Sequence, residues 1–202
     1  MRTKTIFLFI SAIAMMGGLN AQSDAHTISL GARLGGSSLT AELGENGSIG
    51  FTFALEANYH FTENLRAGLE YNSSAIGYGD DTSTFGISAY GSNLILAKGE
   101  YHFFTSKLRP YVGLGLGIAT ISTPELTGTD ADGNTGVLVP SESTTNFAIS
   151  PRLGVALGKF HIDFTYNFAG NTPESEGFNV DESGLAFNYW AVTLGYVYPI
   201  EF

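Results

Sequence analysis

The sequence predicts an all-β fold, an eight-stranded antiparallel up-and-down transmembrane β-barrel preceded by a cleavable signal peptide. Three observations lead to this prediction. Apolar and polar residues alternate with a period of two along most of the chain, which is typical of β-strands with two different faces. The charged residues of the expected strands all fall on one face. Short turns and long polar connections alternate between the strands, as in outer-membrane barrels.

The N-terminus has the layout of a secretory signal peptide. Arg2 and Lys4 supply a positive region, residues 6–16 form an apolar run, and Ala21 ends a stretch that fits a small-residue cleavage site. The run is too short for a membrane-spanning helix, although a retained N-terminal anchor is the alternative. We therefore expect a signal peptide over residues 1–21 and a barrel domain over residues 22–202.

The composition of the remaining chain limits its partners. It contains no cysteine, and no later apolar run approaches the ~18 residues of a membrane helix. A membrane location would therefore require a closed barrel, because only helices and closed barrels satisfy their backbone groups in lipid. Removal of Arg2 and Lys4 leaves seven basic and 19 acidic residues, a net charge of −12. This balance argues against nucleic acid, since phosphate binding needs a basic patch.

Eight segments carry the alternating pattern. The last of them is the clearest, because seven apolar or aromatic residues between Trp190 and Phe202 share one face. Such a segment is somewhat longer than the ~9–11 residues that cross a bilayer at a tilt. The expected strands span residues 28–34, 51–61, 65–72, 87–103, 108–118, 146–157, 160–168 and 189–202. Short turns are expected at residues 62–64, 105–107 and 158–159, and long connections near residues 37–48, 73–86, 121–145 and 169–186.

The segment over residues 87–103 fits the pattern least well. Tyr101 fits the outer face, whereas Leu94 and Leu96 fall on the inner one. A β-bulge near Lys98 and Gly99 would account for this, and so would a partly apolar lumen.

Ten charged residues lie in the expected strands, and all ten fall on the inner face. They are Arg33, Glu56, Arg66, Glu70, Lys98, Glu100, Arg109, Arg152, Asp163 and Glu201. A lipid-facing Arg or Lys costs about 2–4 kcal/mol at mid-membrane, so this segregation has a physical cause. Five are basic and five acidic, and an eight-stranded barrel is just wide enough for side chains to fill it. We therefore expect a charge-paired, plugged lumen, in which Gly113, Gly115 and Gly117 leave room for bulky neighbours.

The long connections have the opposite charge character, because they contain acidic residues and no Lys or Arg. The acidic residues are Glu42, Glu45, Asp80, Asp81, Glu125, Asp130, Asp132, Glu142, Glu174, Glu176, Asp181 and Glu182. The plain interpretation is solubility and repulsion. A sharper one is divalent-cation bridging to anionic lipopolysaccharide.

No catalytic, cofactor or metal site is predicted. Residues 130–134 begin like a calcium loop but lack the later Glu, so a turn is the better interpretation. His161 and Asp163 share a face, as the polar residues of a lipid-modifying enzyme would, but no Ser has a matching spacing and His161 points inward. His60 and His102 are expected to be interior structural residues, and could bind a metal only if the barrel brought them together.

Segments 61–65, 108–117 and 196–202, together with the barrel pattern, resemble the small outer-membrane β-barrel (porin-like) family of the OmpA transmembrane-domain and OmpX/Ail type. The resemblance implies a location in the outer membrane of a Gram-negative bacterium. A C-terminal Phe preceded by apolar residues at alternate positions resembles the signal read by the barrel assembly machinery. The residues that match this assembly signal are Tyr196, Tyr198, Ile200 and Phe202.

Family likeness implies fold and location more than activity, since such barrels include structural proteins, adhesins, channels and enzymes. We predict a monomer with a structural or surface-interaction role at the cell surface and without enzymatic activity. Its expected partners are outer-membrane lipids, lipopolysaccharide and, during biogenesis, the barrel assembly machinery. The alternative is a narrow channel for small or apolar solutes, which the Gly-rich strand and the inward Leu94 and Leu96 would favour. A lipid-modifying enzyme is a further alternative, and a soluble lipocalin-like barrel would instead turn its apolar faces inward.

Overall fold

The computed structural model describes residues 25–40, 49–78, 88–104, 107–123, 126–129, 135–139, 141–173 and 185–200. The regular structure of these residues consists of β1 (Ile28–Leu39), β2 (Ile49–His60), β3 (Leu65–Tyr78), β4 (Ser88–His102), β5 (Leu108–Ser122), β6 (Leu126–Thr129), β7 (Thr135–Val139), β8 (Ser143–Leu157), β9 (Phe160–Asn171) and β10 (Ala186–Ile200). Within these ranges there is no helix long and apolar enough to cross a membrane. The expected signal peptide lies outside the described residues, and its cleavage stays a prediction.

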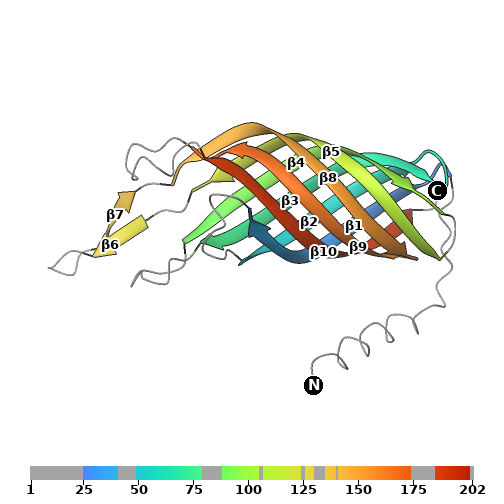
Figure 1. Ribbon diagram of the computed structural model, residues 1–202, viewed down its shortest axis with the longest axis horizontal. Coiled ribbons are helices and arrows are strands. Elements are labelled where there is room, and N and C mark those ends of the chain that lie inside the picture. Colours follow the sequence, from blue (N-terminus) through green and yellow to red (C-terminus); the bar gives the residue numbers. More distant parts are fainter. Residues whose placement is uncertain are drawn as a thin grey trace, which may run out of the picture.

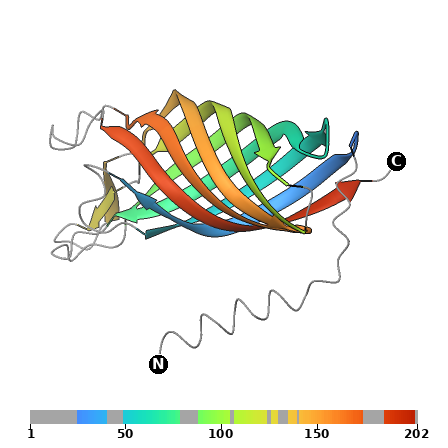
Figure 2. The same cartoon turned by 45° about the vertical axis from the view of Figure 1, so that its right-hand side comes forward.

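Eight of the strands close into a barrel whose order is β1-β10-β9-β8-β5-β4-β3-β2 (Figure 1). Every neighbouring pair is antiparallel. The barrel closes where β1 pairs with β10, in unbroken register from Ile28 opposite Ile200 to Leu39 opposite Tyr189. Closure removes the unpaired edges that an open sheet would expose, and the strands run obliquely around the wall (Figure 2). The predicted eight-stranded antiparallel barrel is therefore confirmed.

The two faces of the barrel wall differ in polarity as the alternation predicts. Phe164 and Leu194 are 39% and 62% exposed on the outer surface, whereas Arg66, Arg109 and Arg152 are at most 6% exposed. A soluble lipocalin-like barrel would show the reverse, with its apolar side chains enclosed. The outer wall is thus a surface that favours contact with hydrocarbon over contact with water.

Strand β4 resolves the ambiguity between a bulge and a partly apolar lumen. Its register with β3 and β5 is continuous through Lys98 and Gly99, so the β-bulge alternative is wrong. Leu94 and Leu96 are fully buried on the same face as Lys98. The lumen is therefore partly apolar.

Several strands continue further toward the long connections than the sequence pattern predicts. Strand β1 ends at Leu39 instead of residue 34, and β3 ends at Tyr78 instead of residue 72. In the added part of β3 the inward side chains are Ser74 and Ile76, while the outward ones include Ser73 and Ala75. The outer face thus carries small residues there, which hides the continuation of the strand from a search for large outward apolar residues.

A small hairpin in the connection between β5 and β8 was not predicted. Strands β6 and β7 form a separate two-stranded sheet that lies beyond one end of the barrel (Figure 1). At its base the Thr123 backbone N–H donates to the Glu142 carbonyl at 2.8 Å, and the Ser141 hydroxyl donates to the Thr123 carbonyl at 2.7 Å. Strands of four and five residues are too short to show periodicity in sequence. Residues 130–134, the calcium-loop-like segment, lie outside the described residues.

Candidate functional site

The lumen has zones of different chemistry along the barrel, which the inner face of β3 shows in order. From the short-turn end, its inward residues include Arg66, Glu70, Asn72, Ser74 and Ile76. Charged side chains thus come first, amide and hydroxyl groups follow, and an apolar residue comes last. Two of these zones are complete enough to be treated as layers across the lumen.

The first zone, called the charge layer below, contains side chains joined by ion pairs. Its members are Arg33, Glu56, Glu70, Lys98, Glu100, Arg152 and Asp163. Arg66 and Arg109 are also buried, closer to the short turns. Of the ten charged residues expected in the lumen, nine are thus enclosed by the wall, while Glu201 lies outside the described residues.

Arg33 is the centre of the charge layer. Its Nη2 atom lies 2.5 Å from Glu56 Oε2 and also donates to Glu70. Its Nη1 atom donates to Asp163 Oδ1 at 3.1 Å. These three carboxylates come from β2, β3 and β9, so one guanidinium on β1 connects four strands across the lumen.

A second set of pairs surrounds Glu70. Arg152 Nη2 donates to Glu70 Oε1 at 2.9 Å, and Arg152 Nη1 lies 2.7 Å from Glu70 Oε2. Lys98 Nζ lies 2.5 Å from Glu56 Oε2 and 2.7 Å from Glu100 Oε1. Glu56 and Glu70 therefore each have cations from different strands around them, which compensates part of the cost of removing charges from water.

Inward glycines provide the space that these long side chains occupy. A Cβ at Gly113 would lie 2.9 Å from Arg152 Cγ, and a Cβ at Gly195 would lie 2.5 Å from Arg33 Cγ. The expectation that glycines of β5 leave room for bulky neighbours is confirmed for Gly113 and for Gly115, which faces Leu96 at 3.1 Å. At Gly117 the close neighbour is instead the backbone carbonyl of the adjacent strand.

Tyr111 is an important lumen residue that the sequence pattern did not single out. Its hydroxyl donates to Asp163 Oδ1, so Asp163 is held by both Tyr111 and Arg33. Tyr111 lies opposite Gly154, where a Cβ would come within 2.5 Å of the tyrosine ring. An inward aromatic residue opposite a glycine was the available signal, but it becomes readable only when the register is known.

The barrel brings some of the interior histidines together near the short turns. The His102 ring stacks on Tyr111 with centroids 4.6 Å apart, and its centroid lies 6.2 Å from that of His161. His60 Nε2 lies 2.8 Å from Ser29 Oγ. Among the described residues there is no group of three or more potential ligands that could hold a metal ion. His161 is only 3% exposed and faces the lumen.

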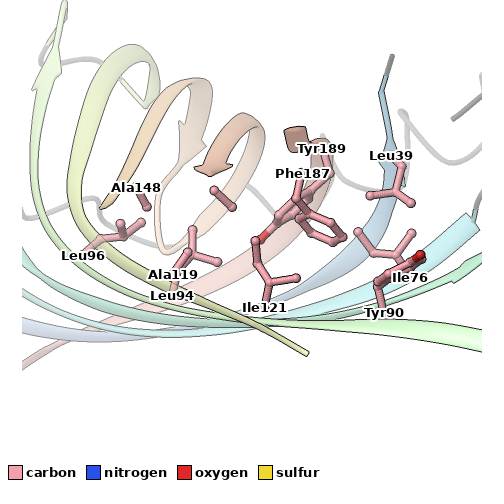
Figure 3. Close-up of a cluster of buried hydrophobic side chains, with 11 residues drawn as sticks. Leu39, Ile76, Tyr90, Leu94, Leu96, Ala119, Ile121, Ala148, Phe187 and Tyr189 are labelled. Carbon is pink, nitrogen blue, oxygen red and sulfur yellow. The ribbon is translucent and has the colours of Figure 1, made fainter. Parts of the chain in front are cut away.

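The second complete zone, called the apolar layer below, lies toward the long connections (Figure 3). Its members are Leu39, Ile76, Tyr90, Leu94, Leu96, Ala119, Ile121, Ala148, Ala169, Phe187 and Tyr189. The Phe187 ring is central, with centroids 5.8 Å from both Tyr90 and Tyr189. The sequence pattern indicated only Leu94 and Leu96. Some of the other members lie in segments that were expected to be connections, and the rest lie on strands that were recognised by the apolar residues of their outer faces.

The residues of the expected assembly signal lie on β10. Tyr196 and Tyr198 are exposed on the outer surface, and Ile200 is half-buried at the end of the strand. Phe202 lies outside the described residues. Recognition by an assembly machinery stays a prediction.

Comparison with known proteins assigns the chain to a family and finds solved structures with a similar fold. Residues 5–198 match the sequence profile described as outer membrane protein beta-barrel domain. The solved structure of the Neisserial surface protein A is similar with a TM-score of 0.59 at 18% identity, covering 87% of this chain and 97% of that one. The attachment invasion locus protein Ail of Yersinia pestis, in complex with the heparin analogue sucrose octasulfate, is similar with a TM-score of 0.51 at 15% identity, covering 87% and 100%. No curated protein matches the sequence significantly.

Proposed function

Because the chain belongs to the outer membrane protein β-barrel domain family, we propose that it is an integral outer-membrane barrel with a closed lumen and a structural or surface-interaction role. The family implies the bacterial outer membrane. Export through the expected signal peptide is part of the proposal. The outward apolar wall and the absence of charged side chains from it, among the described strands, support insertion into lipid.

The single observation that carries the closed lumen is the presence of buried side chains at two levels. At the first level Arg33, Glu70 and Arg152 are at most 4% exposed. At the second level Leu94 and Phe187 are fully buried. A diffusion pore would expose lumen side chains to water and would show a ring of one charge sign. The lumen of this protein contains paired charges of both signs instead.

A surface-interaction role rests on the long connections, which carry 12 acidic residues and no basic ones. The similar protein Ail was solved with a sulfated heparin analogue. The net charge of this chain is negative, so its long connections would repel such a polyanion. We propose that its exposed end meets cationic partners, or anionic lipopolysaccharide bridged by divalent cations.

An enzymatic role is not proposed, because His161 and Asp163, the polar residues that the sequence suggested for it, are in the lumen. Asp163 is held by Arg33 and Tyr111, and His161 is buried beside His102. None of these groups can reach a lipid substrate on the outer wall. Replacement of His161 by Ala should accordingly leave the lipid A profile of cells unchanged, and an altered profile would restore the enzyme alternative.

The second candidate is a narrow channel for apolar solutes, and the apolar layer is the observation that favours it. A liposome uptake assay with small apolar and polar probes separates it from the closed barrel. Uptake of apolar probes above the rate of protein-free liposomes would support the channel.

The primary test combines fractionation of cells with two measurements on the refolded protein. Heat-modifiable gel migration and outer-membrane fractionation should both identify a folded membrane barrel. Planar bilayers that contain the refolded protein should show no stable conductance steps. Recovery in a soluble fraction would contradict the membrane assignment, and large regular steps would contradict the closed lumen.

A further inference from the structure

We infer that the apolar layer, and not the charge layer, is the barrier that stops ions and water from crossing the lumen. This inference rests on the proposed closed barrel and assigns its closure to named side chains. It differs from the channel alternative, because it gives the inward apolar residues the opposite role.

The apolar layer extends across the whole lumen. Its members come from β1, β3, β4, β5, β8, β9 and β10, which are seven of the eight barrel strands. On the remaining strand, β2, the position near Ile76 is Gly50, and a Cβ there would lie 2.8 Å from Ile76 Cγ1. The side chain of Ile76 therefore covers the wall where β2 contributes none. A solute that follows the lumen must pass through this layer.

The layer is packed rather than merely apolar. Ile76, Leu94, Ile121 and Phe187 are each fully buried, so their surfaces are inaccessible to water. Figure 3 shows side chains from opposite walls that project toward one another, with Phe187 and Tyr189 over Ile121. A hydrophobic constriction excludes ions because it offers them no replacement for their hydration shell.

The charge layer has the opposite property. Among the described residues, Arg33 Nε, Arg152 Nε and Asp163 Oδ2 are buried atoms without a hydrogen-bond partner in the protein. Buried polar atoms of this kind are usually satisfied by ordered water. Side chains that already solvate charge can also solvate an entering ion. The charge layer therefore offers water and ions many polar partners, whereas the apolar layer offers few, such as Ser92 Oγ between Tyr90 and Leu94 on β4.

The test compares the ionic conductance of variants that carry two substitutions in one layer or the other. In the first variant Phe187→Ser and Ile76→Ser place hydroxyl groups in the apolar layer. In the second, Glu70→Gln and Arg152→Gln remove the ion pair between these two residues and the pairs of Glu70 with Arg33 and Lys98, without changing the net charge of the lumen. The matched control, Phe168→Ser with Ile95→Ser, makes the same kind of change on the outer wall, where these residues are 46% and 56% exposed.

We expect the apolar-layer variant to raise the ionic conductance of planar bilayers at least about tenfold over wild type, as a barrier lowered by ~1.4 kcal/mol would. The charge-layer variant and the outer-wall control should stay as closed as wild type. All proteins are first checked for folding by heat-modifiable migration. Phe187→Ala alone replaces the double variant if that one does not fold.

The outcomes separate this inference from the proposed function. A closed wild type with a folded but closed apolar-layer variant would overturn the inference and leave the closed barrel intact. Conductance through the charge-layer variant would overturn it as well, because the barrier would then lie among the ion pairs. A wild type that conducts on its own would refute both.

Discussion

The two halves of the lumen are both filled by side chains, but the side chains differ in chemistry. Toward the short turns, long charged side chains fill the interior and are held by ion pairs such as Arg33–Asp163. Toward the long connections, Ile76, Leu94 and Phe187 fill it as an ordinary hydrophobic core does. The charge layer depends on partners from several strands being present together, whereas the apolar layer depends on volume.

This difference has a consequence for mutations. A cation removed from the charge layer leaves buried carboxylates with less compensation, which is costly because a low-dielectric interior does not solvate them. A methyl group removed from the apolar layer leaves a cavity, whose cost depends on how far its neighbours can relax. Substitutions in the two layers should therefore lower the stability of the barrel by different mechanisms. The following variants measure these losses.

The largest effect is expected for Arg33→Met. This change leaves Glu56, Glu70 and Asp163 without their shared cation and should destabilise the folded barrel by about 3–5 kcal/mol. Urea unfolding of the refolded protein in lipid vesicles measures it. The added change Asp163→Asn should recover part of the loss, because Arg33 is the cation paired with Asp163 in the charge layer. A double variant less stable than the single one would contradict the ion-pair account.

A somewhat smaller effect is expected for Leu94→Ala. Leu94 is fully buried in the apolar layer, so truncation should cost about 2–4 kcal/mol through lost burial and a residual cavity. Ile95 is its neighbour on the same strand but is 56% exposed on the outer wall. Ile95→Ala should cost clearly less in the same urea titration. Equal losses for the two variants would show that the inner face of β4 is not a packed core.

The smallest effect is expected for an added methyl group beside the charge layer. Gly113→Ala would place a Cβ 2.9 Å from Arg152 Cγ and 2.9 Å from the Gly99 carbonyl, and should cost about 1–3 kcal/mol. Gly99→Ala is the matched control, since its Cβ would meet no heavy atom closer than 4.0 Å. This control should be neutral or slightly stabilising, because glycine weakens a strand. A Gly113 variant as stable as wild type would indicate that Arg152 has room to move.

Much of the fold could be predicted because a barrel in lipid imposes a simple rule on its sequence. Outward residues such as Phe164 and Leu194 must be apolar, and inward ones such as Arg66 need not be, so a period of two marks strands and faces together. The rule predicted the strand number, the sidedness and the enclosure of the charged residues. It failed in the outer parts of β1 and β3, where the large apolar residues Leu39 and Ile76 lie inward and the outer face carries small residues.

Within the strands that the alternation marked, the sequence by itself determined which side chains enter the lumen, because the parity of a residue along a strand decides the face on which it lies. Only the tertiary structure decided which of them meet. Arg33 and Asp163 are 130 residues apart in the chain and come together through closure and register. The assembly of Leu39, Ile76 and Phe187 into one layer has the same origin. The stagger of the strands around the barrel sets these contacts, and parity along a single strand does not contain that information.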